Sequence, residues 1–173
     1  MSIEFYYNSL VGWLRILCDG DAITGLFFTD TAPANADGVK WLDSANVLCV
    51  PPAHVDDLPP IAAQCARELD EYFSGARTAF TVKTRNAGTP FRERCWAELL
   101  TIPYGQTRTY GEMAEAIGNK NAARAVGGAN NKNNISIIYP CHRVIGADGA
   151  LVGYGGGLWR KQWLLEFERN NIK

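Results

Sequence analysis

The sequence predicts a mixed α/β fold of the α+β type, with a strand-rich domain at residues 1–85 and a mainly helical domain at residues 86–173. Near the N-terminus, residues 3–8 and 11–18 alternate apolar and polar side chains in the manner of strands, and the tight turn Asp19-Gly20-Asp21 leads into a third strand near residues 22–29. The second half instead contains short segments with helical spacing and recognisable start and stop residues.

The rest of the first domain follows these three strands. Residues 30–40 hold proline, asparagine and glycine and are typical of a loop. A helix is predicted from Pro60 to Phe73, because apolar side chains recur at helical spacing and Gly75 follows as a stop. Residues 79–83 favour one more strand, and residues 86–89 are typical of a linker.

The second domain is predicted to contain four helices. Thr89 is placed to cap a helix whose first residue is Pro90. Residues 109–118 and 121–130 form two short helices separated by a few residues with a glycine, which is the helix-turn-helix pattern. A last helix covers residues 158–168.

The second helix of this pair has an unusual surface. A single cation, Arg124, projects from a segment built mostly of alanine and glycine, and such small residues let a helix backbone approach a groove closely. The alternative is a small-residue helix packed against another helix, with Arg124 in solvent.

The most informative segment is Tyr139-Pro140-Cys141-His142-Arg143-Val144, which places a thiol beside an imidazole and after a proline of fixed φ. A β-rich run from Ile135 to Tyr139 precedes it, so we expect Cys141 where a buried strand ends. A polarisable sulfur on a rigid backbone with a base nearby suits a nucleophilic cysteine. A packed core cysteine is the alternative, since free cysteine is often buried.

Cysteine usage and hydropathy narrow the class of protein. Five cysteines occur without a CxxC pair, and the N-terminus lacks a signal peptide, so reduced thiols and a cytoplasmic location are expected. Cys49 and His54 could begin a zinc site, but no further ligands cluster with them, and no metal is expected. The sequence contains no run of about 18 apolar residues, so no membrane span is expected.

Charge is distributed unevenly along the chain. Residues 1–85 carry a formal charge of −5 and residues 86–173 one of +4, which together give the net −1 of the whole protein. A basic face suits phosphate contact, and an acidic half limits non-specific association. Salt-sensitive binding to nucleic acid is therefore expected. No GxGxxG or Walker motif occurs, so no cofactor is expected.

Several rare sequence blocks occur together between Thr89 and Glu168. They are Thr89-Pro90-Phe91, Ile102-Pro103-Tyr104-Gly105-Gln106-Thr107, Tyr110, Ala122 through Gly127, Pro140 through Ile145, Gly153-Tyr154, Gly156 through Lys161, Trp163-Leu164-Leu165 and Glu168. In this order and spacing they resemble the O6-methylguanine-DNA methyltransferase family of DNA repair proteins, in its single-function bacterial type. Residues 1–85 match only in general character, as the family's strand-rich scaffold domain.

The resemblance implies a reaction and its partners. The alkyl group of O6-alkylguanine, and also that of O4-methylthymine, would pass directly and irreversibly from double-stranded DNA to the protein's own cysteine. Each molecule would act once, because a thioether offers no leaving group. A monomer without an obligate protein partner and without a cofactor is expected.

The resemblance also implies catalytic roles. Cys141 is the nucleophile, and His142 activates it through a water. Glu168 orients the imidazole, and Asn133 braces the turn near the thiol.

Contacts to DNA and to the base are implied in the same way. Arg124 fills the gap left when the base rotates out of the stack, and Tyr110 crowds the 3′ phosphate. The helix that enters the minor groove contacts DNA through Ala123, Gly127 and Asn130.

The base pocket is expected to form from Tyr154, Gly155, Gly156 and Val144. The first two belong to a loop that closes the pocket and donates to the departing guanine. Gly155 stands where many relatives have serine, so one side-chain donor is missing, and Asn134 stands where a proline is common.

Two other functions stay open on the residues alone. An alkyltransferase-like protein would bind the lesion and recruit excision repair, but it would lack the reactive cysteine that stands here at Cys141. A cysteine hydrolase would use the Cys-His pair, but it would not need a groove-entering helix or Arg124.

Overall fold

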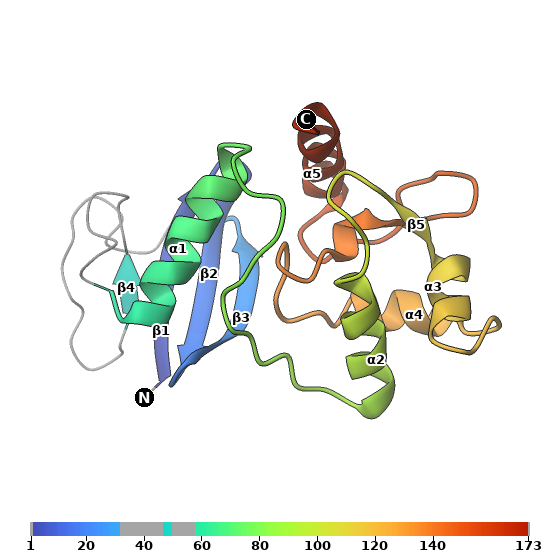
Figure 1. Ribbon diagram of the computed structural model, residues 1–173, viewed down its shortest axis with the longest axis horizontal. Helices are drawn as coiled ribbons and strands as arrows, with labels where there is room; N and C mark the ends of the chain where they lie inside the picture. Colours follow the sequence, from blue (N-terminus) through green and yellow to red (C-terminus); the bar gives the residue numbers. More distant parts are fainter. Residues whose placement is uncertain (1, 32–46, 50–57, 173) are drawn as a thin grey trace. The chain divides into compact units, whose positions relative to one another are not determined.

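The computed structural model describes residues 2–31, 47–49 and 58–172, which form two compact units, Met1–Arg85 and Asn86–Lys173. In the first unit, helix α1 (Pro60–Phe73) lies across one face of a four-stranded sheet (Figure 1). The second unit is mainly helical. The predicted mixed α/β fold is therefore confirmed.

The sheet of the first unit has its three longest strands where the sequence predicts them. Strands β1 (Ser2–Ser9), β2 (Gly12–Asp19) and β3 (Ala22–Thr29) pair antiparallel in succession. An unpredicted short strand, β4 (Val47–Cys49), pairs parallel to β1 and gives the order β3-β2-β1-β4. Side chains alternate between the two faces of a strand, so every second residue of these strands points to the same face. The buried apolar side chains of the strands and of α1 include Phe5, Leu14, Ile16, Leu26, Cys65, Leu69 and Tyr72.

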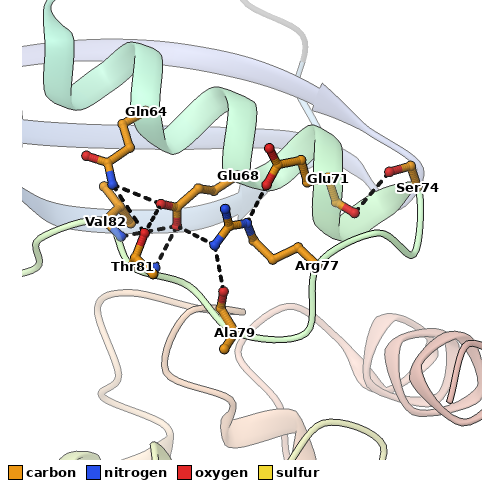
Figure 2. A network of polar contacts seen from close by, with 8 residues as sticks. All are labelled: Gln64, Glu68, Glu71, Ser74, Arg77, Ala79, Thr81 and Val82. Atoms are coloured by element: carbon orange, nitrogen blue, oxygen red, sulfur yellow. Dashed lines mark hydrogen bonds and ion pairs between the residues drawn. The ribbon is translucent and has the colours of Figure 1, made fainter. Parts of the chain in front are cut away.

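The strand predicted at residues 79–83 is wrong, and Glu68 on α1 explains why. Its buried carboxylate accepts the backbone N–H of Thr81 at 2.8 Å and that of Val82 at 3.1 Å, as Figure 2 shows. Amides engaged by a carboxylate cannot donate to a sheet ladder. The segment therefore runs irregularly until Thr84, which makes one isolated parallel bridge with Ile23.

Some sequence-based expectations cannot be compared with the fold. The loop predicted at residues 30–40 lies outside the described residues beyond Thr31, as do His54 and the side chain of Cys49. Within the described part, no three side chains of His, Cys, Asp or Glu are grouped to hold a metal ion. None of the helices in that part is both long and apolar enough to cross a bilayer.

All four helices predicted for the second unit are present. They are α2 (Pro90–Leu99), α3 (Tyr110–Ala116), α4 (Ala123–Asn130) and α5 (Leu158–Asn170). The side chain of Thr89 caps α2 by accepting the Arg92 N–H at 3.4 Å. Trp96 of α2, nearly fully buried, donates its indole N–H to the Ala129 carbonyl of α4 at 2.9 Å, which ties the two helices together.

The buried strand predicted from Ile135 to Tyr139 is also wrong. The segment folds into turns, with the Tyr139 N–H donating to the Ile135 carbonyl and Ile137 at a φ of 69°. Its isoleucines are buried nonetheless, so the apolar run reflects packing rather than sheet pairing. Cys141 therefore begins a short 3₁₀ helix, Cys141–Arg143, which leads into strand β6 (Val144–Ile145) beside β5 (Arg108–Thr109).

Candidate active site

The thiol of Cys141 is enclosed, with only 6% of the residue exposed. The backbone N–H of Cys141 donates to the Tyr139 carbonyl at 2.8 Å, which fixes the residue at the start of its 3₁₀ turn. Burial raises the pKa of the thiol, while an Asn133 hydrogen bond and the charge of Lys161 act in the opposite direction. An enclosed thiol of this kind reacts only when a base accepts its proton.

Asn133 uses its whole amide to hold the turn around the thiol. Its Nδ2 donates to Cys141 Sγ at 3.2 Å and to the Tyr139 carbonyl at 2.8 Å. Its Oδ1 accepts the Ile135 N–H and the Asn86 amide, each at 3.1 Å. The expected bracing residue thus contacts the sulfur itself.

His142 and Glu168 meet in a fully buried pair. Nε2 of His142 lies 2.8 Å from Oε1 of Glu168. Burial tends to raise the pKa of Glu168, but His142 and Arg143 outweigh it and hold that pKa well below its usual value. An ionised carboxylate can only accept, so Nε2 carries the proton and Nδ1 has a free lone pair. Nδ1 is buried and makes no hydrogen bond among the residues described.

Arg143 completes the surroundings of Glu168. Its Nε and Nη2 donate to the two carboxylate oxygens at 2.8 and 2.9 Å, and its Nη1 donates to the Ile102 carbonyl at 2.6 Å. The Gly105 N–H also donates to Glu168, at 3.0 Å. No role for Arg143 was predicted from the sequence, although its position directly after His142 is a signal that could have suggested one.

Lys161 is a second residue near the thiol for which no role was predicted from the sequence. It is fully buried, donates from Nζ to the Val152 carbonyl at 3.0 Å, and lies 5.7 Å from the centre of the Tyr110 ring. The Tyr110 hydroxyl donates to the same carbonyl at 3.0 Å. Burial lowers the pKa of Lys161, and a Cys141 thiolate would raise it again. The sequence signal was a lysine on the inward face of α5.

The glycine-rich loop before α5 is held by the first turn of that helix. Arg160 Nη1 donates to the Gly156 carbonyl at 2.9 Å, and its guanidinium lies 4.4 Å from the centre of the Trp159 ring. At Gly157, φ is 88°, in the left-handed region that favours glycine. Tyr154 packs against the core around Cys141, and burial raises its pKa well above the usual value, so its hydroxyl stays protonated.

An open groove of about 600 Å³ lies along α4 and joins it to α3 and the loop. Its lining comprises Tyr110, Ala123, Arg124, Gly127, Gly128, Asn131, Val152 and Gly153. A methyl group at Gly127 would lie 3.7 Å from the Tyr110 ring, at ordinary van der Waals distance, so the ring lies directly beside α4 at this position.

The structure thus brings most of the expected DNA-binding residues into one groove. Asn130 is not among the residues that line it, because it is buried at the end of α4. Val144 is buried in the core with Cys141. Gly156 is buried as well, whereas Gly155 is exposed.

Two family models match the chain. The model of the 6-O-methylguanine DNA methyltransferase ribonuclease-like domain matches residues 3–85, and that of the DNA binding domain of the same family matches residues 90–170.

Curated relatives at high sequence identity are named methylated-DNA–protein-cysteine methyltransferases. A methylated-DNA–protein-cysteine methyltransferase of Mycobacterium leprae is 54% identical over 165 residues, which are 95% of this chain and 91% of the relative. One of Methanosarcina acetivorans is 54% identical over 75% of this chain and 83% of its own length.

Solved structures agree with the sequence relatives. A Mycobacterium tuberculosis O6-methylguanine methyltransferase is 40% identical and superposes with a TM-score of 0.81, covering 100% of this chain and 96% of the other. A structure of Mycobacterium tuberculosis OGT in complex with DNA gives a TM-score of 0.80 at 40% identity, covering 97% of this chain and 93% of that one.

Proposed function

The chain belongs to the 6-O-methylguanine DNA methyltransferase family, and from that premise we propose that Cys141 takes the alkyl group from O6 of guanine in damaged DNA. The protein is thus a methylated-DNA–protein-cysteine methyltransferase, and it repairs DNA by alkyl transfer. One observation supports Cys141 as the nucleophile most strongly. Its buried thiol accepts a hydrogen bond from Asn133, and the next residue, His142, forms a buried pair with Glu168.

The proposed chemistry is an in-line displacement at the alkyl carbon. The sulfur–carbon bond forms as the carbon–O6 bond breaks, and the electron pair of that bond passes to guanine. Nδ1 of neutral His142 receives the thiol proton through a water, while Glu168 holds the imidazole in the tautomer that leaves Nδ1 free. Tyr154 is a candidate to donate to the departing O6, because its hydroxyl keeps its proton.

Access to the lesion requires that the base leave the duplex. O6 of guanine lies inside the stacked helix, so an enzyme that acts there must extrude the nucleotide. We propose that α4 enters the minor groove of the DNA and that the groove along this helix lies against the DNA backbone. Exposed Arg124 would then enter the base stack, and Tyr110 would lie against the phosphate. The pocket that receives the extruded guanine would also admit O4-methylthymine.

The two units have separate proposed roles. Residues 86–173 would bind DNA and carry out the transfer, because the thiol, its partners and the groove all belong to this unit. Residues 1–85 would serve as a scaffold. A monomer suffices for this reaction, since every proposed group comes from one chain.

A label-transfer experiment tests the proposal. Duplex DNA with a labelled methyl group on guanine O6 is incubated with the protein, and the label is followed. We expect covalent label on Cys141, at no more than one methyl group per molecule, and none on Cys141→Ala, which still binds the DNA. Binding without label would indicate a lesion sensor, and turnover beyond one lesion per molecule would contradict the single-use mechanism.

A further inference from the structure

The side chain of Asn130 is buried, and its amide has no hydrogen-bond partner in the part of the chain that the structure describes. The residue is 8% exposed, and neither its Oδ1 nor its Nδ2 makes a hydrogen bond among the residues that the structure describes. Asn133, one turn further on, has its amide fully engaged. Buried amides are normally paired, because an unpaired one loses its hydration without compensation.

The register of α4 places Asn130 beside the groove. At about 100° per residue, Asn130 lies about 20° from the direction of Ala123, which lines the groove, and about 40° from that of Val126, which is buried in the core. Asn130 therefore stands where the floor of the groove meets the core. It also stands at the thiol end of the helix, since its carbonyl accepts the N–H of Asn133, whose amide contacts Cys141.

We propose that Asn130 is a specificity-determining residue whose amide hydrogen-bonds the 2-amino edge of the extruded O6-alkylguanine. The inference rests on the proposed function, and it gives the unpaired amide a partner that is present only when substrate is bound. Burial before binding means that little water has to be displaced from the amide when the base arrives.

The donor and acceptor pattern of the base singles out this edge. An asparagine amide offers one acceptor beside a pair of donors. The 2-amino group is the exocyclic donor of O6-alkylguanine, and it stands between two ring nitrogens with lone pairs, N1 and N3. On either side, the amide oxygen can accept from the amino group while the amide N–H donates to a ring nitrogen, as in bidentate readout of purines.

A cycle of two proteins and two substrates tests the pairing. Single-turnover transfer rates are measured for wild type and Asn130→Leu on duplexes carrying O6-methylguanine or O6-methylhypoxanthine, which lacks the 2-amino group. We expect wild type to prefer O6-methylguanine by about tenfold, the discrimination of one good hydrogen-bonded pair, and Asn130→Leu to lose most of that preference. Gln162→Leu, which removes an exposed amide on α5, should keep it.

Thermal stability separates this role from a structural one. Removal of an unpaired buried amide should raise Tm or leave it unchanged, whereas loss of a structural amide would lower it by several degrees. Asn130→Ala, which adds no bulk, is measured in parallel. The proposal is overturned if both variants keep the wild-type preference, or if they lower Tm and slow both substrates equally. Absence of any transfer by wild type would instead overturn the proposed function and this inference with it.

Discussion

At the scale of single residues, the site depends on which groups stay charged. Glu168 stays ionised because His142 and Arg143 outweigh the effect of burial on its pKa, and His142 is neutral because burial lowers its pKa. Neutral imidazole beside an ionised carboxylate is the state in which His142 can accept a proton.

Glu168→Gln should slow transfer and also destabilise the protein. The amide would no longer stabilise a protonated His142, and it would leave the buried guanidinium of Arg143 without its counter-charge. We expect the single-turnover rate to fall by at least about tenfold, because part of the roughly 10²–10⁴-fold that general-base catalysis contributes is lost. Tm should fall as well, because breaking a buried ion pair costs about 3–5 kcal/mol. DNA affinity should stay near wild type.

Glu166→Gln is the matched control, because it neutralises an exposed carboxylate on the same helix. A comparable loss of rate in that variant, or a loss of DNA affinity in Glu168→Gln as large as its loss of rate, would argue against an orienting role.

Gly155→Ser should shift substrate preference toward small alkyl groups. A methyl group added at Gly155 would meet no atom within 4 Å, so the fold accepts serine there. The hydroxyl would supply a donor to guanine O6, worth about 1.5–3 kcal/mol toward a developing charge, and would fill space beside the alkyl group. Transfer rates on O6-methyl- and O6-benzylguanine DNA check this, and an unchanged or higher benzyl-to-methyl ratio would refute it.

At the scale of elements, helix α5 organises the site from one face. Its inward residues include Arg160 and Lys161, which hold the Gly156 and Val152 carbonyls, and Glu168, which holds the imidazole two turns later. The loop between those two carbonyls contains Tyr154 and Gly155. One rigid helix therefore positions both the proposed pocket wall and His142, the proposed general base.

Arg160→Met should loosen the pocket wall without changing the thiol. Methionine keeps an apolar stem but loses the hydrogen bond to the Gly156 carbonyl, a bond from a charged donor worth about 1.5 kcal/mol or more. Transfer from O6-benzylguanine, with DNA or as the free base, should slow by about tenfold. Alkylation of Cys141 by iodoacetamide should be unaffected.

Arg169→Met removes an exposed cation from the same helix and should behave as wild type. If iodoacetamide alkylation slowed as much as transfer did in Arg160→Met, Arg160 would act on the thiol and not on the loop.

Helix α4 carries Arg124, the residue proposed for the step that is specific to duplex DNA. Arg124→Ala should slow transfer from duplex DNA much more than the reaction with free O6-benzylguanine, because only the duplex requires unstacking of the base. Lys120→Ala removes a nearby exposed cation that does not line the groove, and it should weaken binding slightly without this selectivity. Equal slowing of duplex and free-base reactions by Arg124→Ala would exclude it from base extrusion.

At the scale of the whole molecule, the two units should respond differently to acid. Burial lowers the pKa of His142 from its ordinary 6.5, so folding of the second unit opposes uptake of this proton. The contribution of neutral His142 to the stability of this unit is present above pH 6.5 and is lost as the pH falls through the folded-state pKa of His142. In the first unit, burial tends to raise the pKa of Glu68, but its hydrogen bonds lower it below 4.5. That contribution is lost only in stronger acid.

Urea unfolding at pH 7 and pH 5 tests this difference. The free energy of unfolding should decrease as the pH decreases, by up to about 1.4 kcal/mol per pH unit for the one proton that His142 takes up. His142→Gln should flatten this dependence between pH 7 and 5, whereas Glu68→Gln should keep it. An unchanged slope in His142→Gln would mean that another group controls the acid response.

The sequence by itself determined the local elements and the identity of the chemistry. The first three strands, α1 and the helices of the second unit follow from side-chain periodicity and from local start and stop residues such as Thr89 and Gly75. These signals act over a few residues, so they can be read without knowing the fold. The block around Cys141 likewise indicated a nucleophile.

The tertiary structure alone decided where charged and polar groups find their partners. Residues 79–83 form no strand because Glu68 of α1 accepts the backbone N–H groups of Thr81 and Val82. Ile135 to Tyr139 form turns and no strand, and Asn133 holds these turns by accepting the Ile135 N–H. Asn133 and Asn130 are the same residue type, yet among the residues described the amide of Asn133 is hydrogen-bonded and that of Asn130 is not. Hydrogen bonding and burial depend on residues brought together by folding, so only the folded chain distinguishes the two asparagines.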